Sequence, residues 1–312
     1  MNAVRVHRLH ADAGRHSVEG MEPADSSAPD SAPSAPLLLD RYRPLARIGR
    51  GGAAFVFRGR DEYLGRDVAI KVFSGGNELH VEMYRAELRM LAALSHHGVV
   101  SIVDAGVDTS APEDPRPFLV MQLVQGTTVR DRVAERPLSV REIGEIGYEV
   151  AEALEYVHAQ SIIHRDITPS NIMIVNYGTL HSRERAMLTD FGIAVEVADA
   201  GFQSEAITGT APYLSPEQVR NHPLTTASDI YSLGLVLLEC FTRARAFPGA
   251  HIPSAMARLA GPPEMPPEAV PEPWRSLLQR MTAAEPELRP TAADLGAEIR
   301  LALRDMRPRS RS

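Results

Sequence analysis

The sequence has almost no cysteine and no long apolar run, and both absences narrow the kinds of protein it can encode. Cys240 is the only cysteine among 312 residues, so an intrachain disulfide and a site with several thiolate ligands are both excluded. The longest apolar run, residues 230–241, contains Glu239 and is about half of the roughly 20 residues that a membrane-spanning helix needs. We expect a buried helix there, with Cys240 as a packing residue rather than a reactive thiol.

The charge pattern also lacks features typical of two other classes of protein. The formal net charge of -7 shows no basic bias of the nucleic-acid-binding kind. Arg5 and Arg8 are not followed by an apolar stretch, which argues against a secretory signal. We therefore expect a cytoplasmic protein that has no membrane segment and does not bind nucleic acid.

Both ends of the chain differ in composition from the middle. Residues 22–36 are nearly all Pro, Ala, Ser and Asp, with too little large apolar surface to offset the entropy of ordering. We interpret residues 1–38 as a disordered arm, with docking or phosphorylation as the alternative role. The basic tail, residues 304–312, predicts a frayed and solvated end, or else an electrostatic contact with an acidic partner.

The hydrophobic period changes near Gly126. Before it, β-forming stretches at residues 54–57, 68–73, 99–107 and 118–124 surround one helical pattern at residues 78–95. After it, Ser139 and Glu142 form a capping-box pattern ahead of a helical stripe, and further helices are predicted at residues 228–242 and 291–306. This predicts an α+β fold of two lobes, a small β-rich lobe at residues 39–125 and a larger, mainly α-helical lobe at residues 126–303.

Two features of the first lobe suggest phosphate binding, although each has an ordinary alternative. Residues 48–56 (IGRGGAAFV) lie between two strand patterns, and glycines there let backbone N–H groups approach phosphate oxygens. Glycine-rich turns are common, so this stretch alone is weak evidence. Lys71 lies in an apolar strand and needs a partner, either ligand phosphates or a carboxylate such as Glu87 on the next helix. Taken singly, Lys71 and Glu87 are more simply interpreted as surface residues.

The sharpest signal is in the second lobe. Asp166 and Asn171 are five residues apart in a proline-containing loop, residues 164–171. A carboxylate can accept the proton of an attacking hydroxyl, and an amide oxygen can bind a hard cation such as Mg²⁺. Asp190, in Asp190-Phe191-Gly192, adds a second carboxylate suited to a metal ion.

In this order the motifs resemble the eukaryotic-type (Hanks-type) protein kinase family, in the style of bacterial serine/threonine kinases, over roughly residues 39–303. The resemblance implies ATP and Mg²⁺ as cofactors, proteins as substrates and transfer of the γ-phosphoryl group to Ser or Thr. It implies that Lys71 holds the α- and β-phosphates and that Asp166 orients the hydroxyl and accepts its proton. Asn171 and Asp190 would hold the two Mg²⁺ ions.

The same resemblance implies a set of nucleotide-binding residues. Met121 would control access behind the adenine, and residues 122–124 would bind adenine through their backbone. Glu87 would pair with Lys71. The full set is Ile48, Gly49, Arg50, Gly51, Gly52, Ala53, Ala54, Phe55, Val56, Ala69, Lys71, Glu87, Met121, Gln122 and Val124.

Other positions acquire structural or regulatory roles through the resemblance. His164 and Phe191 would pack between the lobes, Asp229 would anchor the catalytic loop, and Glu217 would form a buried ion pair with Arg289. Residues 190–217 would be the activation loop. Of its hydroxyls Ser204, Thr208 and Thr210, Thr208 is the first candidate for a phosphosite that pairs with Arg165, and Thr210 would contact Asp166. A transient homodimer would allow phosphorylation between copies.

Three departures from the family pattern leave alternatives open. Ala54 replaces a loop glycine, Thr168 stands where a lysine usually contacts the γ-phosphate, and Ser215 replaces an alanine. They motivate a pseudokinase scaffold as the alternative function. A third possible function is that of a small-molecule kinase of the aminoglycoside type. Evidence against it comes from residues 215–217, Asp229 and Arg289. Residues 176–185 are longer than the usual hairpin turn and have no functional account.

Overall fold

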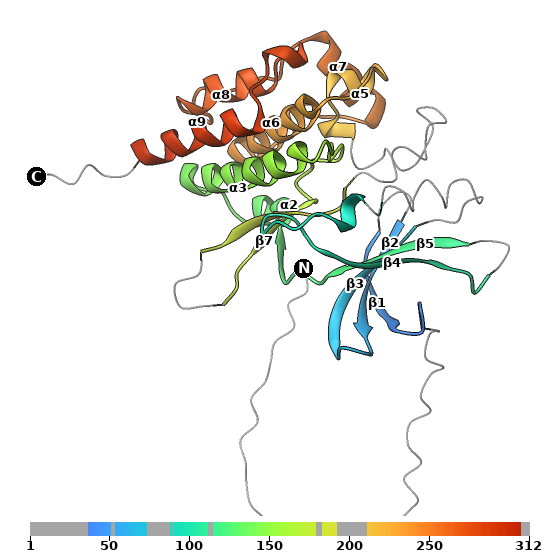
Figure 1. The fold of residues 1–312 in the computed structure, drawn as a ribbon. Coiled ribbons are helices and arrows are strands. Elements are labelled where there is room, and N and C mark those ends of the chain that lie inside the picture. The colour runs from blue at the N-terminus through green and yellow to red at the C-terminus, as the bar shows by residue number, and fades with distance from the viewer. Residues whose placement is uncertain are drawn as a thin grey trace, which may run out of the picture. The chain divides into compact units, whose positions relative to one another are not determined.

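A five-stranded antiparallel sheet forms the first lobe. The computed structural model describes residues 37–50, 54–73, 88, 90–111, 115–178, 183–191 and 211–306. Its first sheet pairs in the order β1-β2-β3-β5-β4 (Figure 1). The strands are β1 (Tyr42–Arg50), β2 (Ala54–Asp61), β3 (Arg66–Phe73), β4 (Ile102–Asp108) and β5 (Arg116–Gln122). The predicted β-rich lobe is confirmed.

The two faces of β3 have different environments. Val68 and Ile70 are buried in a core that also contains Tyr42, Phe118 and Val120. Because side chains alternate along a strand, Ala69 and Lys71 face the opposite side of the sheet. A buried strand therefore holds Lys71 on the face away from this core.

The second lobe is mainly helical, as predicted. A small sheet, β6 (Gly126–Thr128), β7 (Ile172–Val175) and β8 (Arg185–Leu188), lies at its edge. Its helices are α2 (Val129–Glu135), α3 (Val140–Ala159), α5 (Pro216–Val219), α6 (Thr226–Thr242), α7 (His251–Ala260), α8 (Trp274–Met281) and α9 (Ala292–Asp305). Short 3-10 turns occur at Ala211–Tyr213 and Pro286–Leu288. Together the two sheets and the helices confirm the α+β fold class.

Helix α3 begins where the sequence predicts. Ser139 Oγ accepts the N–H of Glu142, and the Glu142 carboxylate accepts the N–H of Ser139, so the capping box is confirmed. Such a pair satisfies backbone donors that the first turn of a helix leaves unbonded. The pKa of Glu142 falls to about 2, mainly because Arg136 donates to its carboxylate.

Helix α6 runs through the core of the second lobe and is buried on almost every side. Cys240 is 2% exposed there, and burial raises the pKa of its thiol, so it packs as an apolar residue as expected. Helix α3 packs beside α6 and α9. The close approach of α3 to α8 and α9 needs glycine at Gly144, where an added Cβ would lie 2.6 Å from Trp274 Cη2 of α8 and 2.7 Å from Leu303 Cδ2 of α9. Among the described residues, no helix combines the length and apolar character needed to cross a membrane.

Residues 95–100 of the first lobe are hydrogen-bonded to the second lobe. Val99 forms a parallel bridge with Leu188, and Val100 N–H donates to the Leu188 carbonyl at 2.9 Å. Ser95 N–H donates to the hydroxyl of Tyr156 on α3 at 2.9 Å. The end of β8 is thus held against the segment that leads into β4 of the first sheet.

Candidate active site

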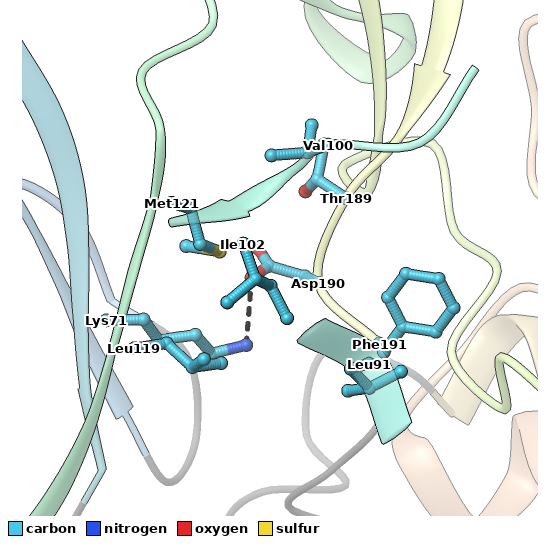
Figure 2. A pocket seen from close by; sticks show the side chains of 9 residues that line it. All are labelled: Lys71, Leu91, Val100, Ile102, Leu119, Met121, Thr189, Asp190 and Phe191. Atoms are coloured by element: carbon cyan, nitrogen blue, oxygen red, sulfur yellow. Dashed lines mark hydrogen bonds and ion pairs between the residues drawn. The ribbon is translucent and has the colours of Figure 1, made fainter. Parts of the chain in front are cut away.

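Lys71 and Asp190 meet between the two lobes although they are 119 positions apart in the chain. Lys71 Nζ lies 2.9 Å from Asp190 Oδ1 (Figure 2). Burial alone would raise the pKa of Asp190, but the charge and hydrogen bond of Lys71 outweigh it and hold that pKa below its usual value. The carboxylate is therefore ionised at neutral pH, as a metal ligand must be.

Asp190 adopts an uncommon backbone conformation. Its φ is +56°, in the left-handed region that residues with a Cβ seldom occupy. Arg165, next to Asp166, has a φ of +70°. Strained conformations of this kind persist only where surrounding contacts enforce them, and they concentrate at functional sites.

Asp166 and Asn171 form a second pair in the loop between α3 and β7. The Asn171 side-chain Nδ2 donates to the Asp166 backbone carbonyl at 2.9 Å and to Asp166 Oδ2 at 2.8 Å. Its amide oxygen accepts no hydrogen bond from the described residues, which leaves it available to a cation. The Thr189 N–H donates to the Asn171 carbonyl at 2.9 Å, so the residue preceding Asp190 is bonded to this loop.

Asp229 on α6 holds the backbone of this loop. Its two carboxylate oxygens accept the N–H groups of His164 and Arg165, each at 2.8 Å, and one of them also lies 2.8 Å from His158 Nε2. The side chain is buried, so these bonds are shielded from water. The predicted anchoring of the loop by Asp229 is confirmed.

His164 is a packing residue, as expected. It is fully buried, and its ring centre lies 4.5 Å from that of Phe191. Its Nε2 lies 3.1 Å from the Thr189 carbonyl, while Nδ1 faces the Asp166 N–H, which assigns the proton to Nε2. Burial lowers the pKa of His164, so the ring is neutral at neutral pH.

The predicted ion pair between Glu217 and Arg289 is confirmed. Two parallel bonds of 2.6 and 2.9 Å join the guanidinium to the carboxylate, and Ser228 Oγ donates to Glu217 Oε1 at 2.7 Å. Burial favours the neutral acid, but the bonds from Arg289 and Ser228 outweigh it and lower the pKa of Glu217. The pair fixes α5 against the start of α6.

A small cavity opens beside the Lys71–Asp190 pair. Its volume of about 20 Å³ holds roughly one water molecule. Its lining residues, labelled in Figure 2, are Lys71, Leu91, Val100, Ile102, Leu119, Met121, Thr189, Asp190 and Phe191. Met121 thus lies at the wall between this cavity and the start of the segment at residues 122–124.

Comparison with known proteins identifies the family that has this arrangement. A profile of the protein kinase domain matches residues 42–298. The chain belongs to the protein kinase family. The serine/threonine-protein kinase PknB of Mycobacterium tuberculosis is 36% identical over 274 residues, which are 84% of this chain and 43% of PknB. PknB of Mycolicibacterium smegmatis is 40% identical over 220 residues, 68% of this chain and 34% of that protein.

A second relative covers more of its own length. The serine/threonine-protein kinase PknA of Mycobacterium tuberculosis is 36% identical over 283 residues, 87% of this chain and 64% of PknA. The chain spans less than half the length of the PknB relatives. The similarity therefore concerns the protein kinase domain.

Several residues of the expected nucleotide and regulatory sites lie outside the described residues. These are Gly51, Gly52, Ala53, Glu87, Gly192, Ser204, Thr208 and Thr210. Among the described ones, Ala54 is an ordinary residue of β2 that pairs with Phe73. Its φ is not positive, so the alanine imposes no strain of the left-handed kind at this position. Thr168 is buried, and its carbonyl accepts the Asn171 N–H at 3.0 Å.

Some contacts near the protein kinase site were not predicted. Ser215 caps α5 by accepting the Gln218 N–H, so this departure from the family pattern gives the helix a capping box. The Gln218 side chain also donates to the Arg165 carbonyl at 2.9 Å. The sequence Ser-Pro-Glu-Gln is a recognisable capping pattern. The bond to Arg165 joins residues 53 apart, and no sequence pattern predicts it.

The composition of the chain also distinguishes Lys71 from its other cationic residues. Lys71 is the only lysine of the chain, and every other cationic side chain except histidine is an arginine. Lysine and arginine differ in shape and hydration, so a single lysine retained beside Asp190 indicates a position where arginine does not serve.

Proposed function

We propose that this protein kinase chain transfers the γ-phosphoryl group of ATP to serine and threonine hydroxyls of proteins. The observation that carries the proposal is the meeting of Lys71 with Asp190 beside the bonded pair of Asp166 and Asn171. The names of the PknB and PknA relatives support the same activity. In this reading the site contains a cation for the phosphates, a base for the hydroxyl and two oxygen ligands for metal.

The donor set fits magnesium. Asn171 offers an amide oxygen and Asp190 an ionised carboxylate, and hard divalent cations prefer such oxygen ligands. Mg²⁺, when bound, neutralises charge on the β- and γ-phosphates. Lys71 would direct its ammonium at the α- and β-phosphates, and Asn171 and Asp190 would hold the metal ions. Gly49, Val56, Ala69 and the segment from Met121 to Val124 would surround the rest of the nucleotide.

Asp166 acts on the acceptor hydroxyl. Its carboxylate is oriented by Asn171, and it accepts the proton as the hydroxyl oxygen attacks the γ-phosphorus. His164 is excluded from this role because its ring is buried and packed on Phe191. Thr168 brings no positive charge to the transferring group, so we expect a slower chemical step than a lysine at that position would give.

Transfer of labelled phosphate tests the proposal. The purified chain is incubated with Mg²⁺, γ-labelled ATP and a generic basic protein, and labelled residues are identified by phosphoamino-acid analysis. We expect phosphoserine or phosphothreonine, with a loss of about 10²-fold or more in Asp166→Asn. Asp305→Asn, an exposed residue at the end of α9, is the matched control and should keep wild-type activity.

Three results would contradict the proposal. ATP binding without any transfer would support the pseudokinase scaffold instead. Transfer that is equal in wild type and Asp166→Asn would mean that the base is elsewhere or that a contaminating kinase is present. Label found only on a small molecule would support a small-molecule kinase instead.

We further propose autophosphorylation in the activation loop, at Thr208 or a neighbouring hydroxyl, through a transient homodimer and in the cytoplasm. This rests on the family resemblance, because Thr208 lies outside the described residues. Mass spectrometry of freshly dephosphorylated chain after incubation with Mg-ATP tests it. A Thr208→Ala variant should lose the modification, and an unmodified wild-type loop after long incubation would contradict it.

A further inference from the structure

A pocket rich in arginine lies on the second lobe, where α3, α9 and the start of β8 come together. Helices α3 and α9 lie side by side, and β8 packs against α3 (Figure 1). The pocket has a volume of about 190 Å³. Its lining residues are Arg141, Glu145, Tyr148, Glu149, Arg183, Arg185, Arg300, Leu303 and Arg304. Two segments without a functional account meet here, the long connection before β8 and the start of the basic tail.

The charge of this arginine pocket is opposite to that of the whole chain. Five guanidinium groups face two carboxylates, which leaves three positive charges in a chain of formal net charge -7. Like charges gathered in one concavity repel each other, and a bound anion relieves that repulsion. The pocket is therefore suited to an anion.

Both carboxylates of the pocket already have partners. Glu149 is mostly buried, accepts the Ala186 N–H at 2.6 Å and lies 3.3 Å from Arg185 Nε. Glu145 pairs with Arg141 at 3.4 Å, one helical turn away. These contacts set the orientation of two guanidinium groups along the wall without neutralising the remaining three.

The other arginines are differently placed. Arg300 donates to the Tyr148 hydroxyl, and its guanidinium carbon lies 4.9 Å from the centre of that ring. Arg183 and Arg304 are exposed, and within the described residues neither has a hydrogen-bond or ion-pair partner. The pocket thus has one guanidinium fixed by a tyrosine and two that remain available to a ligand.

Size and shape favour a compact dianion. With a volume of about 190 Å³, the pocket has room for one phosphoryl group and the end of the side chain that bears it. Guanidinium groups bind phosphate through paired N–H···O bonds, and a phosphoryl ester carries a charge of about -1.5 to -2. A flat membrane or a nucleic-acid duplex does not enter a concave site with carboxylates in its wall.

We propose that the arginine pocket binds a phosphorylated serine or threonine side chain of a protein. We choose a phosphorylated protein as the ligand because a protein kinase produces phosphoserine and phosphothreonine. The choice of ligand therefore rests on the proposed function. The pocket lies along residues 141–149, and about 15 Å of helix separates Glu149 from the end of α3, where the chain turns toward Asp166. A protein phosphorylated at one residue would be held there while a second residue reaches the active site, which raises its effective concentration.

Binding measured without nucleotide tests this proposal separately from catalysis. A short fluorescent peptide with one phosphothreonine is titrated with the full chain, and anisotropy is recorded. We expect saturable binding that weakens as salt rises, and binding at least about ten-fold weaker for the unphosphorylated peptide. A catalytically inactive chain that still binds the phosphopeptide would refute the kinase activity alone.

Substitutions at the two exposed arginines locate the site. Arg183→Gln combined with Arg304→Gln should weaken phosphopeptide binding at least about ten-fold, because each removes a charge-assisted bond. Arg220→Gln combined with Arg245→Gln changes the net charge equally at exposed positions outside the pocket and should bind as wild type. Both variants should keep the wild-type midpoint of thermal unfolding and wild-type transfer to an unphosphorylated substrate.

Three results would overturn the proposal. The first is equal binding by the two double variants. The second is inorganic phosphate binding as tightly as the phosphopeptide, which would indicate a site for a free anion. The third is binding to vesicles containing anionic lipid but not to the phosphopeptide, which would indicate a membrane contact instead.

Discussion

Asn171 donates to both the backbone carbonyl and the carboxylate of Asp166, at 2.9 and 2.8 Å. Its side chain therefore contributes in two ways to the proposed site. The Nδ2 group orients the base, and the amide oxygen is left for a cation. Substitutions that remove one contribution and keep the other can separate them.

Asn171→Asp keeps an oxygen ligand but loses the donor to Asp166 and adds a like charge beside it. We expect the rate of transfer to fall by about 10²-fold while the Mg²⁺ concentration for half-maximal rate does not rise. Asn171→Ala loses both and should show the same loss of rate with a higher Mg²⁺ requirement. Initial rates over a range of Mg²⁺ concentrations distinguish the two. Full activity in Asn171→Asp would show that the bond to Asp166 is dispensable.

The single lysine permits a chemical test of nucleotide binding. An amine-reactive ATP analogue has only two amine targets, Lys71 and the N-terminal α-amine. We expect modification at Lys71, slowed about ten-fold when ATP is present at roughly ten times its Kd. Mass spectrometry of the digested chain measures both sites. The α-amine is the internal control, because ATP should not protect it, and equal labelling with and without ATP would exclude Lys71 from the nucleotide site.

Burial of His164 makes the stability of the fold depend on pH. Its pKa is lowered in the folded state from an ordinary value of about 6.5, so the unfolded chain binds more protons between the two values. Stability is then greatest above about pH 6.5 and falls as the pH drops from there toward the folded pKa, by up to about 1.4 kcal/mol per pH unit. Urea unfolding at a series of pH values should show this loss.

Substitutions identify which histidine causes the pH dependence of stability. His164→Asn should reduce the slope of stability against pH below 6.5, even if it lowers stability at every pH. Some slope should remain, because burial also lowers the pKa of His96. His222→Asn, at an exposed position, is the matched control and should leave the slope unchanged. An unaltered slope in His164→Asn would assign the pH dependence to other groups.

The sequence predicted the loops of the site better than the limits of the strands. Asp166, Asn171 and Asp190 lie in short motifs whose meaning depends on local spacing, and Asp229 and Arg289 follow from the family once those motifs are read. The strand predicted at residues 99–107 begins instead at Ile102, because Val99 bridges to Leu188 of the other lobe. Local propensity contains no information about such a tertiary partner.

The arginine pocket could not be predicted for the same reason. Arg141, Arg185 and Arg300 are distant in the chain and belong to no motif, and each alone reads as a solvated surface charge. Packing of α3 against α9 and of β8 against α3 brings them together. The sequence did single out the connection before β8 and Arg304, but it gave no indication that they share a cavity.

The Glu217–Arg289 pair should contribute to stability out of proportion to an ordinary ion pair. Arg289 is fully buried at its side chain and Glu217 nearly so, and removing one partner leaves the other charged and desolvated. We expect Arg289→Met to lower the free energy of unfolding by about 3 to 5 kcal/mol, measured by urea denaturation. The exposed pair of Arg280 and Glu298 is the control, and Arg280→Met should cost about 1 kcal/mol or less.

A double-mutant cycle decides whether the stability lost in Arg289→Met comes from losing the buried pair or from leaving the Glu217 charge buried alone. In the combined Glu217→Gln and Arg289→Met variant no net charge remains buried, so we expect part of the stability lost in Arg289→Met to return. Transfer activity should be lower than wild type in Arg289→Met and should not recover in the double variant, because the pair positions α5, whose Gln218 side chain donates to the Arg165 carbonyl next to Asp166. If the double variant is less stable than the sum of the single losses predicts, the cost arises from packing of the two side chains and not from an uncompensated charge.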